Sequence, residues 1–189
     1  MVAVIYLLLD EGAFQKRADG SMRPASWWLL TPYFAGAWLN SRWWTRRTAV
    51  ADVIVPGLLL GRLPRRGERE ALGVAATVDL TAELPFASAG ACYANVAQLD
   101  LTAPTPEQLA GSVQAIDRAF ARGPVLVCCA LGFSRSAAAA AAWLLASGHA
   151  REVAQAIALV RGARRGVVLG PAYVQALERY AHNLTEQKA

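Results

Sequence analysis

The sequence contains little of the side-chain chemistry that binds metals or crosslinks secreted proteins. Its 189 residues include only three cysteines and two histidines. Cys92, Cys128 and Cys129 are odd in number and two are adjacent, which excludes a regular disulfide framework and favours a reducing compartment. His149 and His182 lie far from each other and from the cysteine pair. Because no metal-ligand spacing occurs, neither a metal site nor another cofactor is expected.

Long hydrophobic runs are also missing. The opening MVAVIYLLL and the later WWLLTPYFAGAWL (27–39) are both too short to span a bilayer, and the second contains Pro32. The amino terminus has neither the basic region nor the small-residue cleavage site of a signal peptide. These absences predict a cytoplasmic protein and leave open a position at the inner face of the membrane.

What the sequence does have is apolar content and positive charge. Apolar residues make up 55% of the chain, enough for the core of one domain with an extension, and no internal repeat occurs. The net charge of +5 favours anionic partners, which include phosphorylated molecules, acidic membrane surfaces and nucleic acid. No nucleic-acid-binding module is recognisable, so nucleic acid is not expected as a partner.

Tryptophan is concentrated near the amino terminus. Five of the six tryptophans lie between Trp27 and Trp44. Three arginines close this stretch: Arg42, Arg46 and Arg47. Tryptophan beside arginine is typical of a membrane interface, where aromatic rings sit at headgroup level and cations meet anionic lipid. Residues 1–48 are therefore predicted to form a separate aromatic and basic segment that contacts a membrane surface through 27–47. The alternative is an arm that packs on the catalytic domain or on a partner.

From Ala49 onward the pattern is that of an α/β domain, predicted to cover 49–189. Strands are expected at 52–62 (broken by the turn at Pro56 and Gly57), 73–80, 93–101 and 124–129, and helices at 105–120, 136–145, 153–160 and 174–181. The helix from Thr105 has a capping-box sequence, with Gln108 three residues later. Alternating strands and helices predict a central, mostly parallel sheet flanked by helices.

The stretch CCALGFSRS (128–136) joins the last of these strands to a helix. Free N–H groups of such a loop and of the helix start converge on one point, and the helix dipole adds positive potential, so the arrangement predicts an anion site. A thiol at this point loses its proton more easily. Arg135 offers a planar fork that matches two phosphate oxygens, and Gly132 lets the backbone approach a ligand.

The choice between the two cysteines follows from strand geometry. Successive side chains of a strand point to opposite faces, so only one cysteine can face the loop. Cys129 encloses five residues with Arg135, a loop that can wrap one tetrahedral anion, and Cys129 is therefore the predicted nucleophile. Cys128 is predicted to be a buried strand residue. The phosphate is expected to be bound by the loop residues Ala130, Leu131, Gly132, Phe133, Ser134 and Arg135.

The motif VLVCCALGFSRSA resembles the Cys-x5-Arg-Ser/Thr signature of the dual-specificity phosphatases, a family of cysteine-dependent enzymes with a protein tyrosine phosphatase-like fold. The resemblance extends over about residues 50–183. The segment FQKRADGSMRPASWWLLTPYFAGAWLNSRWW is similar to the linker of bacterial proteins that join a membrane-embedded PAP2-type lipid phosphatase to such a domain, so the chain is expected to correspond to their C-terminal half. The family usually has His immediately before the nucleophile, and Cys128 stands there instead.

Further site residues follow from this resemblance and from the chemistry. Leaving-group departure needs a proton, which a carboxylic acid on a loop usually supplies. Asp100 ends a predicted strand and stands about thirty residues before the cysteine, where the family has its general acid; the alternatives Asp79 and Glu83 are expected to shape the rim of the site, and Asp117 lies within a helix. The resemblance also implies that Ser136 hydrogen-bonds the nucleophilic sulfur.

The predicted activity is metal-independent hydrolysis of phosphomonoesters through a phosphocysteine. The family implies a protein tyrosine, serine or threonine phosphatase. Three alternatives remain open: a phosphatase for phosphoinositides or phosphatidylglycerol phosphate at a membrane surface, an inactive phosphate-binding module, and a rhodanese-type sulfur transferase, which also uses a thiolate in an anion loop. A disulfide between Cys92 and Cys129 under oxidation also stays open at this point.

Overall fold

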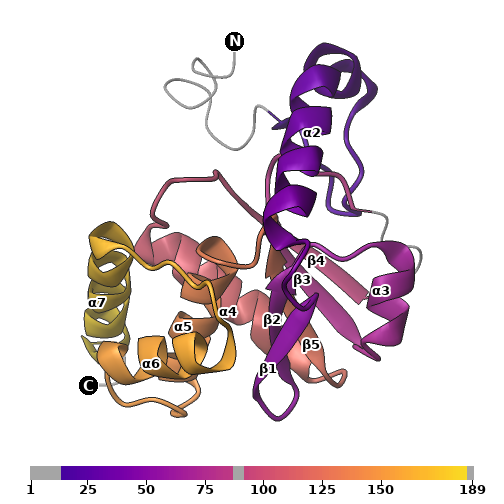
Figure 1. Ribbon diagram of the computed structural model, residues 1–189. Helices are drawn as coiled ribbons and strands as arrows, with labels where there is room; N and C mark the ends of the chain where they lie inside the picture. The colour runs from indigo at the N-terminus through magenta and orange to yellow at the C-terminus, as the bar shows by residue number, and fades with distance from the viewer. Residues whose placement is uncertain (1–13, 87–91, 187–189) are drawn as a thin grey trace.

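A five-stranded sheet forms the centre of the molecule (Figure 1). The computed structural model describes residues 14–86 and 92–186. The strands lie in the order β1-β2-β5-β3-β4. Their bounds are β1 (Ala51–Val55), β2 (Leu58–Arg62), β3 (Ala76–Thr81), β4 (Cys92–Gln98) and β5 (Val125–Cys129). Within this sheet the hairpin of β1 and β2 is antiparallel, whereas β2, β5, β3 and β4 pair in parallel. The predicted mostly parallel α/β sheet is therefore confirmed.

Helices cover both faces of this sheet. Their bounds are α2 (Pro24–Thr45), α3 (Arg66–Ala71), α4 (Pro106–Phe120), α5 (Arg135–Ala146), α6 (Val153–Ala163) and α7 (Pro171–Glu186). The group α4 to α7 packs on one face, and α3 lies on the other side of the sheet (Figure 1). The capping box of α4 forms as expected: Thr105 Oγ1 accepts from the N–H of Gln108, and Gln108 Oε1 accepts from the N–H of Thr105.

Strand β5 separates two apolar clusters by the alternation of its side chains. Val125, Val127 and Cys129 belong to the large core beneath α4 and α5. Leu126 and Cys128 belong to a smaller core on the opposite face. The two adjacent cysteines thus lie on opposite faces of the sheet, as the period of two predicts.

The tryptophan-rich stretch forms one helix, α2, of 22 residues, with Pro32 inside it. It begins with Pro24 in the first turn, where the missing N–H costs no hydrogen bond. Leu30 and Phe34 of α2 form a buried cluster with Phe14 and with Ala82 and Leu99, which follow β3 and β4. Because parallel strands end at the same edge, α2 lies over the carboxyl ends of β3 and β4 (Figure 1).

A buried ion pair ties the chain before α2 to the sheet. Lys16 Nζ lies 2.6 Å from Asp79 Oδ2 in β3, and both side chains are almost fully buried. Lys16 also donates to the backbone and hydroxyl oxygens of Thr81. Residues 14–45 thus pack against the α/β part of the chain; the domain division at residue 48 stays a prediction. Within the residues described, no helix is long and apolar enough to cross a bilayer.

Candidate active site

Cys129 stands at the carboxyl end of β5, and two donors point at its sulfur. The backbone N–H of Gly132 lies 3.3 Å from Sγ, and the hydroxyl of Ser136 lies 3.2 Å from it. Ser136 belongs to the first turn of α5, so the helix begins beside the sulfur. Donors of this kind stabilise a thiolate more than a thiol, because a thiolate is the stronger acceptor.

The carbonyl groups of the loop face away from this point. Arg164 Nε donates to the carbonyl of Gly132 at 3.0 Å, Arg164 Nη2 reaches that of Leu131 at 3.4 Å, and the N–H of Val168 donates to that of Phe133 at 3.0 Å. In a trans peptide the C=O and the following N–H point in opposite directions. The N–H groups of residues 132, 133 and 134 therefore point to the inside of the loop, where a phosphate would lie.

Gly132 is required by the neighbouring strand. It has φ +75°, and a Cβ there would lie 2.4 Å from the backbone carbon of Gly61 in β2. Gly61 is equally tight, since its own Cβ would lie 2.3 Å from the carbonyl oxygen of Val50. This glycine therefore lets the loop pack against β2, which places its N–H on Cys129. The expectation that it also lets the backbone approach a ligand stays a prediction.

Arg135 is buried at the start of α5 and is held by several acceptors. Its Nη1 and Nη2 each donate to one carboxylate oxygen of Glu83, at 2.8 and 2.7 Å, and Nη1 also donates to the carbonyl of Gln98 at 2.9 Å. Asp100 Oδ1 lies 3.2 Å from Nη2. The remaining donor, Nε, is buried without a protein partner. A buried guanidinium N–H of this kind is costly unless an anion binds it.

Glu83 therefore holds the guanidinium in place, a role that its sequence position did not reveal. Burial by itself would raise the pKa of the Glu83 carboxyl, but the charge and hydrogen bonds of Arg135 outweigh it and keep the pKa below its ordinary value. The same pairing, against the opposing effect of burial, raises the pKa of Arg135 well above its usual range. Both groups are thus charged at neutral pH, and the pair is a preformed wall of the site.

Asp100 lies at the mouth of the site, at the position expected for a proton donor. Its side chain is 38% exposed, so it can contact both Arg135 and solvent. It follows β4 in a turn in which Leu101 has φ 61°, unusual for a residue with a branched side chain. The turn is held by hydrogen bonds from Thr102 Oγ1 to the carbonyl of Leu99 and from Tyr173 of α7 to the carbonyl of Thr102.

The other carboxylates do not fit this role. Asp79 is fully buried and is occupied by Lys16, Tyr93 and Thr81. Asp117 lies in α4 and accepts a hydrogen bond from the indole N–H of Trp143 at 2.7 Å. Neither carboxylate lines the pocket at the loop, so the structure leaves Asp100 as the exposed acid beside Arg135.

Cys128 occupies the small core on the other face of the sheet, away from the loop. Burial, followed by the negative charges of Asp79 and Cys129, raises the pKa of the Cys128 thiol well above its ordinary value. Cys128 therefore stays a neutral thiol at physiological pH. It fills the position where the family usually has histidine without adding a positive charge.

The third cysteine is too far away for a disulfide with Cys129. Cys92 of β4 is level with Ala76 of β3, which is level with Val125 of β5. Cys92 is therefore two strands away from Cys129 across the sheet, which is about 10 Å. It is also four residues away along the strand direction, which is about 13 Å. A disulfide needs Cα atoms within about 7 Å. All three cysteines are free, and the possibility of a Cys92–Cys129 crosslink is excluded for this fold.

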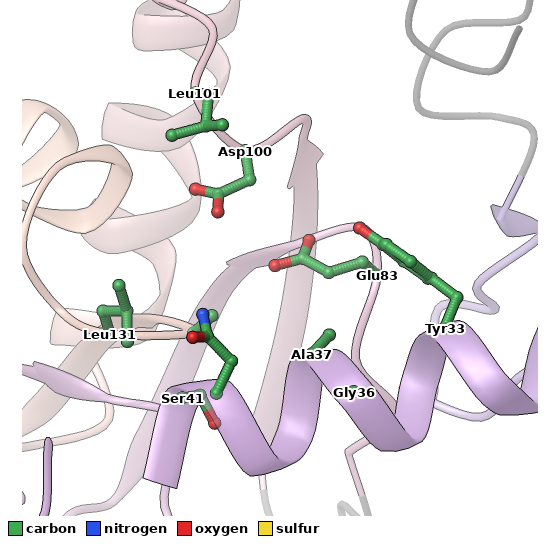
Figure 2. Close-up of a pocket in the computed structure, with 10 residues that line it drawn as sticks. Tyr33, Gly36, Ala37, Ser41, Glu83, Asp100, Leu101 and Leu131 are labelled. Carbon is green, nitrogen blue, oxygen red and sulfur yellow. The ribbon is translucent and has the colours of Figure 1, made fainter. Parts of the chain in front are cut away.

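A pocket of about 460 Å³ opens above the loop. Figure 2 shows α2 along one side of it, with the carboxylates of Asp100 and Glu83 facing the cavity. The lining residues are Tyr33, Gly36, Ala37, Asn40 and Ser41 of α2, with Glu83, Asp100, Leu101, Ala130 and Leu131. The tryptophan-rich helix α2 thus forms one wall of the candidate active site, which agrees with the alternative of an arm that packs on the catalytic domain.

Comparison with known proteins agrees with this geometry. Residues 65–183 match the family model of the dual specificity phosphatase catalytic domain. A structure of PTPMT1 in complex with PI(5)P is 24% identical, covers 75% of this chain and 100% of that one, and gives a TM-score of 0.66. The structure of Tk-PTP in its active form is 27% identical, covers 71% of this chain and 98% of that one, and gives a TM-score of 0.63. The structure of human DUSP28 is 28% identical, covers 72% of this chain and 96% of that one, and also gives a TM-score of 0.63. A search of curated proteins found no match. Since the family model covers more than half of the chain, the protein belongs to the dual specificity phosphatase family and is a cysteine-dependent phosphatase.

Proposed function

We propose that Cys129 is the nucleophile of phosphomonoester hydrolysis. Its thiolate sulfur attacks phosphorus, the bond from phosphorus to the ester oxygen breaks, and the Asp100 carboxylic acid gives its proton to that oxygen. Water then attacks the phosphocysteine, Asp100 takes one proton from it, and the S–P bond breaks to release phosphate and restore the thiolate. Ser136, which donates to Sγ, stabilises the sulfur as it leaves.

The phosphate is bound by the loop residues 130–135. The inward N–H groups and the unpaired Nε of Arg135 meet the equatorial oxygens, where charge is carried in the transition state. One observation carries this proposal: two donors converge on Cys129 Sγ while a buried Arg135 N–H lacks a protein partner.

The substrate proposed first is a phosphorylated tyrosine, serine or threonine of a protein. A phosphoinositide or phosphatidylglycerol phosphate is the second candidate. It is supported by α2, which lines the pocket and also exposes several tryptophans, so that residues 27–47 can contact a membrane surface. A cytoplasmic location, at the inner face of the membrane for the lipid substrate, is part of this proposal.

Hydrolysis of p-nitrophenyl phosphate tests the assignment of the nucleophile. Cys129→Ser is expected to abolish turnover, whereas Cys128→Ser retains a substantial fraction because its side chain lies in the other core. Equal loss in two folded variants would contradict the assignment. Stoichiometric phosphate binding by the wild type without product release would instead indicate a binding module.

A comparison of leaving groups tests Asp100. Removal of a general acid typically costs about 10²- to 10⁴-fold in rate. Asp100→Ala should therefore reduce hydrolysis of an alkyl phosphate strongly and that of p-nitrophenyl phosphate much less, since nitrophenolate leaves without protonation. A loss that does not depend on the leaving group would contradict the role. Phosphopeptides, phosphoinositides and phosphatidylglycerol phosphate assayed side by side would separate the two substrate classes.

A further inference from the structure

A second hollow lies on α2, separate from the catalytic pocket. It has a volume of about 470 Å³. It is lined by Trp27, Thr31, Phe34, Ala35, Trp38 and Leu39 of α2 with Leu84 and Pro85. None of these residues lines the catalytic pocket, and at 100° per residue the two sets lie on different sides of the helix. We call this hollow the apolar groove.

Arginines gather at the end of the apolar groove marked by Trp38. The guanidinium of Arg42 lies 5.7 Å from the centre of the Trp38 indole, and that of Arg65 lies 5.5 Å from it. The positive charge of Arg62 also acts on Arg42, but Arg62 itself forms an ion pair with Glu68 at 2.7 Å. Among the described residues, Glu68 is the one carboxylate that forms an ion pair with any of these three guanidinium groups, so this end of the groove is positively charged.

Arg42 lacks a negative partner of its own. Its Nη2 donates to the carbonyl of Leu63 at 3.0 Å, whereas Nε and Nη1 are buried without a hydrogen-bond partner. Burial, followed by the repulsion of Arg62, lowers the pKa of Arg42 below its ordinary value. A charge in this position is stabilised by a nearby anion, and exposed Arg65 is accessible to one.

The outer surface of α2 is apolar as well. Besides the residues that line the groove, four large apolar side chains of α2 are exposed: Trp28, Leu29, Trp43 and Trp44. Trp28 is 87% exposed, and Arg46 stacks on Trp43 at 3.8 Å. A helix that is apolar around its whole circumference is stable when a second apolar phase covers it. Tryptophan with arginine fits the boundary between lipid headgroups and acyl chains.

We propose that the apolar groove and the arginines beside it bind one phospholipid of an anionic membrane surface. An acyl chain lies along α2 in the groove, and the headgroup phosphate meets Arg65, with the charge of Arg42 behind it. Residues 27–39 span about 18 Å of helix. This length is close to the half-thickness of a bilayer's hydrocarbon core, about 15 Å. The site binds lipid without cleaving it. It deepens the proposed membrane contact of residues 27–47 and rests on that proposal, although its residues are not those of the catalytic pocket.

Phosphatidylglycerol is a suitable probe, because its phosphate is a diester and is not a substrate for a phosphomonoesterase. The full chain would be sedimented with phosphatidylcholine vesicles with and without phosphatidylglycerol. Binding of monomeric dihexanoyl phosphatidylglycerol, followed by nuclear magnetic resonance, would be compared with that of glycerol 3-phosphate. We expect vesicle binding to require the anionic lipid and monomer binding to require the acyl chains.

Two kinds of variant separate a built site from general adhesion. Removing one basic charge from an anionic surface weakens binding about fivefold, so Arg42→Gln with Arg65→Gln should weaken it about 25-fold. Arg122→Gln, which removes an exposed arginine after α4, is the control and should weaken vesicle binding much less. Ala35→Trp adds bulk in the groove without changing charge. It should reduce binding of the short-chain lipid, although an added tryptophan strengthens general partition into membranes.

Hydrolysis of p-nitrophenyl phosphate and circular dichroism should be unchanged in all four substitutions. Equal lipid binding by wild type, Ala35→Trp and the arginine variant would overturn the proposal. Inhibition of p-nitrophenyl phosphate hydrolysis by the short-chain lipid would place the lipid in the catalytic pocket and also overturn it. A stable dimer that forms without lipid, and that Ala35→Trp converts to a monomer, would overturn the proposal as well, because a second copy of the chain would then cover the groove.

Discussion

The loop that surrounds Cys129 depends on one arginine that does not contact the sulfur. Arg164 is buried; it binds the carbonyls of Gly132 and Leu131 and forms an ion pair with Asp52 at 2.6 Å. It holds these carbonyls outward and so turns the following N–H groups inward. We infer that Arg164 is a positioning residue for the loop that would bind phosphate.

The first prediction concerns Arg164→Met. We expect kcat/KM for p-nitrophenyl phosphate to fall about 10- to 100-fold, comparable to the loss of one or two charge-assisted hydrogen bonds. The affinity for inorganic phosphate should fall in parallel, which loss of stability alone would not cause. Arg165→Met is the control, since it removes an exposed arginine from the next position. Unchanged phosphate affinity in a folded Arg164→Met variant would contradict the role.

At the level of single residues, the sequence predicted what is close along the chain. Cys129, Gly132, Arg135 and Ser136 fall within eight residues, so strand alternation and loop length identify their positions. Glu83 is the partner of Arg135 from a position 52 residues away, and no local pattern marks such a pair. Long-range partners of this kind depend on the order of the strands, which a single sequence does not specify.

The short helix α3 depends on the carboxylate of Glu68. Glu68 accepts from Arg62 and from the N–H of Arg65 at the start of the helix. These hydrogen bonds, chiefly that from Arg62, lower the pKa of Glu68 from 4.5 to about 2. A carboxyl whose pKa is lower in the folded state stabilises the fold above its unfolded pKa, and its contribution is lost as the pH falls toward the folded value.

The second prediction is therefore a difference in acid stability. Glu68→Gln should lower the free energy of unfolding at pH 7 by no more than about 1 kcal/mol, because the pair is partly exposed. Between pH 4.5 and 2 the difference from wild type should disappear. Urea unfolding across this range measures it, with Glu178→Gln on the exposed side of α7 as the control. A difference that persists at pH 2 would contradict this assignment.

The third prediction tests how the chain before α2 is anchored to β3. Lys16→Met leaves the carboxylate of Asp79 buried without its ammonium partner. Breaking a buried pair in this way typically costs about 3 to 5 kcal/mol, and urea unfolding should show a loss of that size. Lys16→Met with Asp79→Asn removes both charges and should recover part of the loss. If the double variant is no more stable than Lys16→Met, the loss has another cause than the unpaired charge.

Among the elements, most strands and helices from β1 to α7 were predicted, because the spacing of apolar residues and the capping residues give strong signals there. Helix α2 was not, since Pro32 and an apolar circumference obscure its helical period. The contact of this segment with a membrane stays a prediction; an arm packed on the catalytic domain was the alternative, but its position over the carboxyl edge of the sheet was not predicted. That packing depends on Phe14, Leu30 and Phe34 meeting Ala82 and Leu99, contacts between distant parts of the chain.

In the whole molecule, the proposed reacting groups and the wall of the pocket come from different parts of the chain. In the proposed mechanism the loop after β5 and the turn after β4 supply the reacting groups, whereas α2 forms a wall of the pocket above them (Figure 2). Gly36 and Ala37 of α2 have small side chains, so they leave space in the pocket at this wall. Changes in α2 should therefore alter which phosphomonoesters enter and leave the chemical step intact.

The fourth prediction follows from this division. Ala37→Leu adds bulk to the wall without touching Cys129 or Arg135. Hydrolysis of p-nitrophenyl phosphate should change less than about threefold, whereas kcat/KM for a phosphopeptide or a phosphoinositide should fall about tenfold or more. This fall should come mainly from a higher KM, because steric exclusion weakens the binding of substrate and of transition state alike. Ala35→Leu, on the other side of α2, is the matched control and should leave both activities unchanged on soluble substrates. An equal loss for small and large substrates would mean that α2 supports the catalytic loop instead of selecting the substrate.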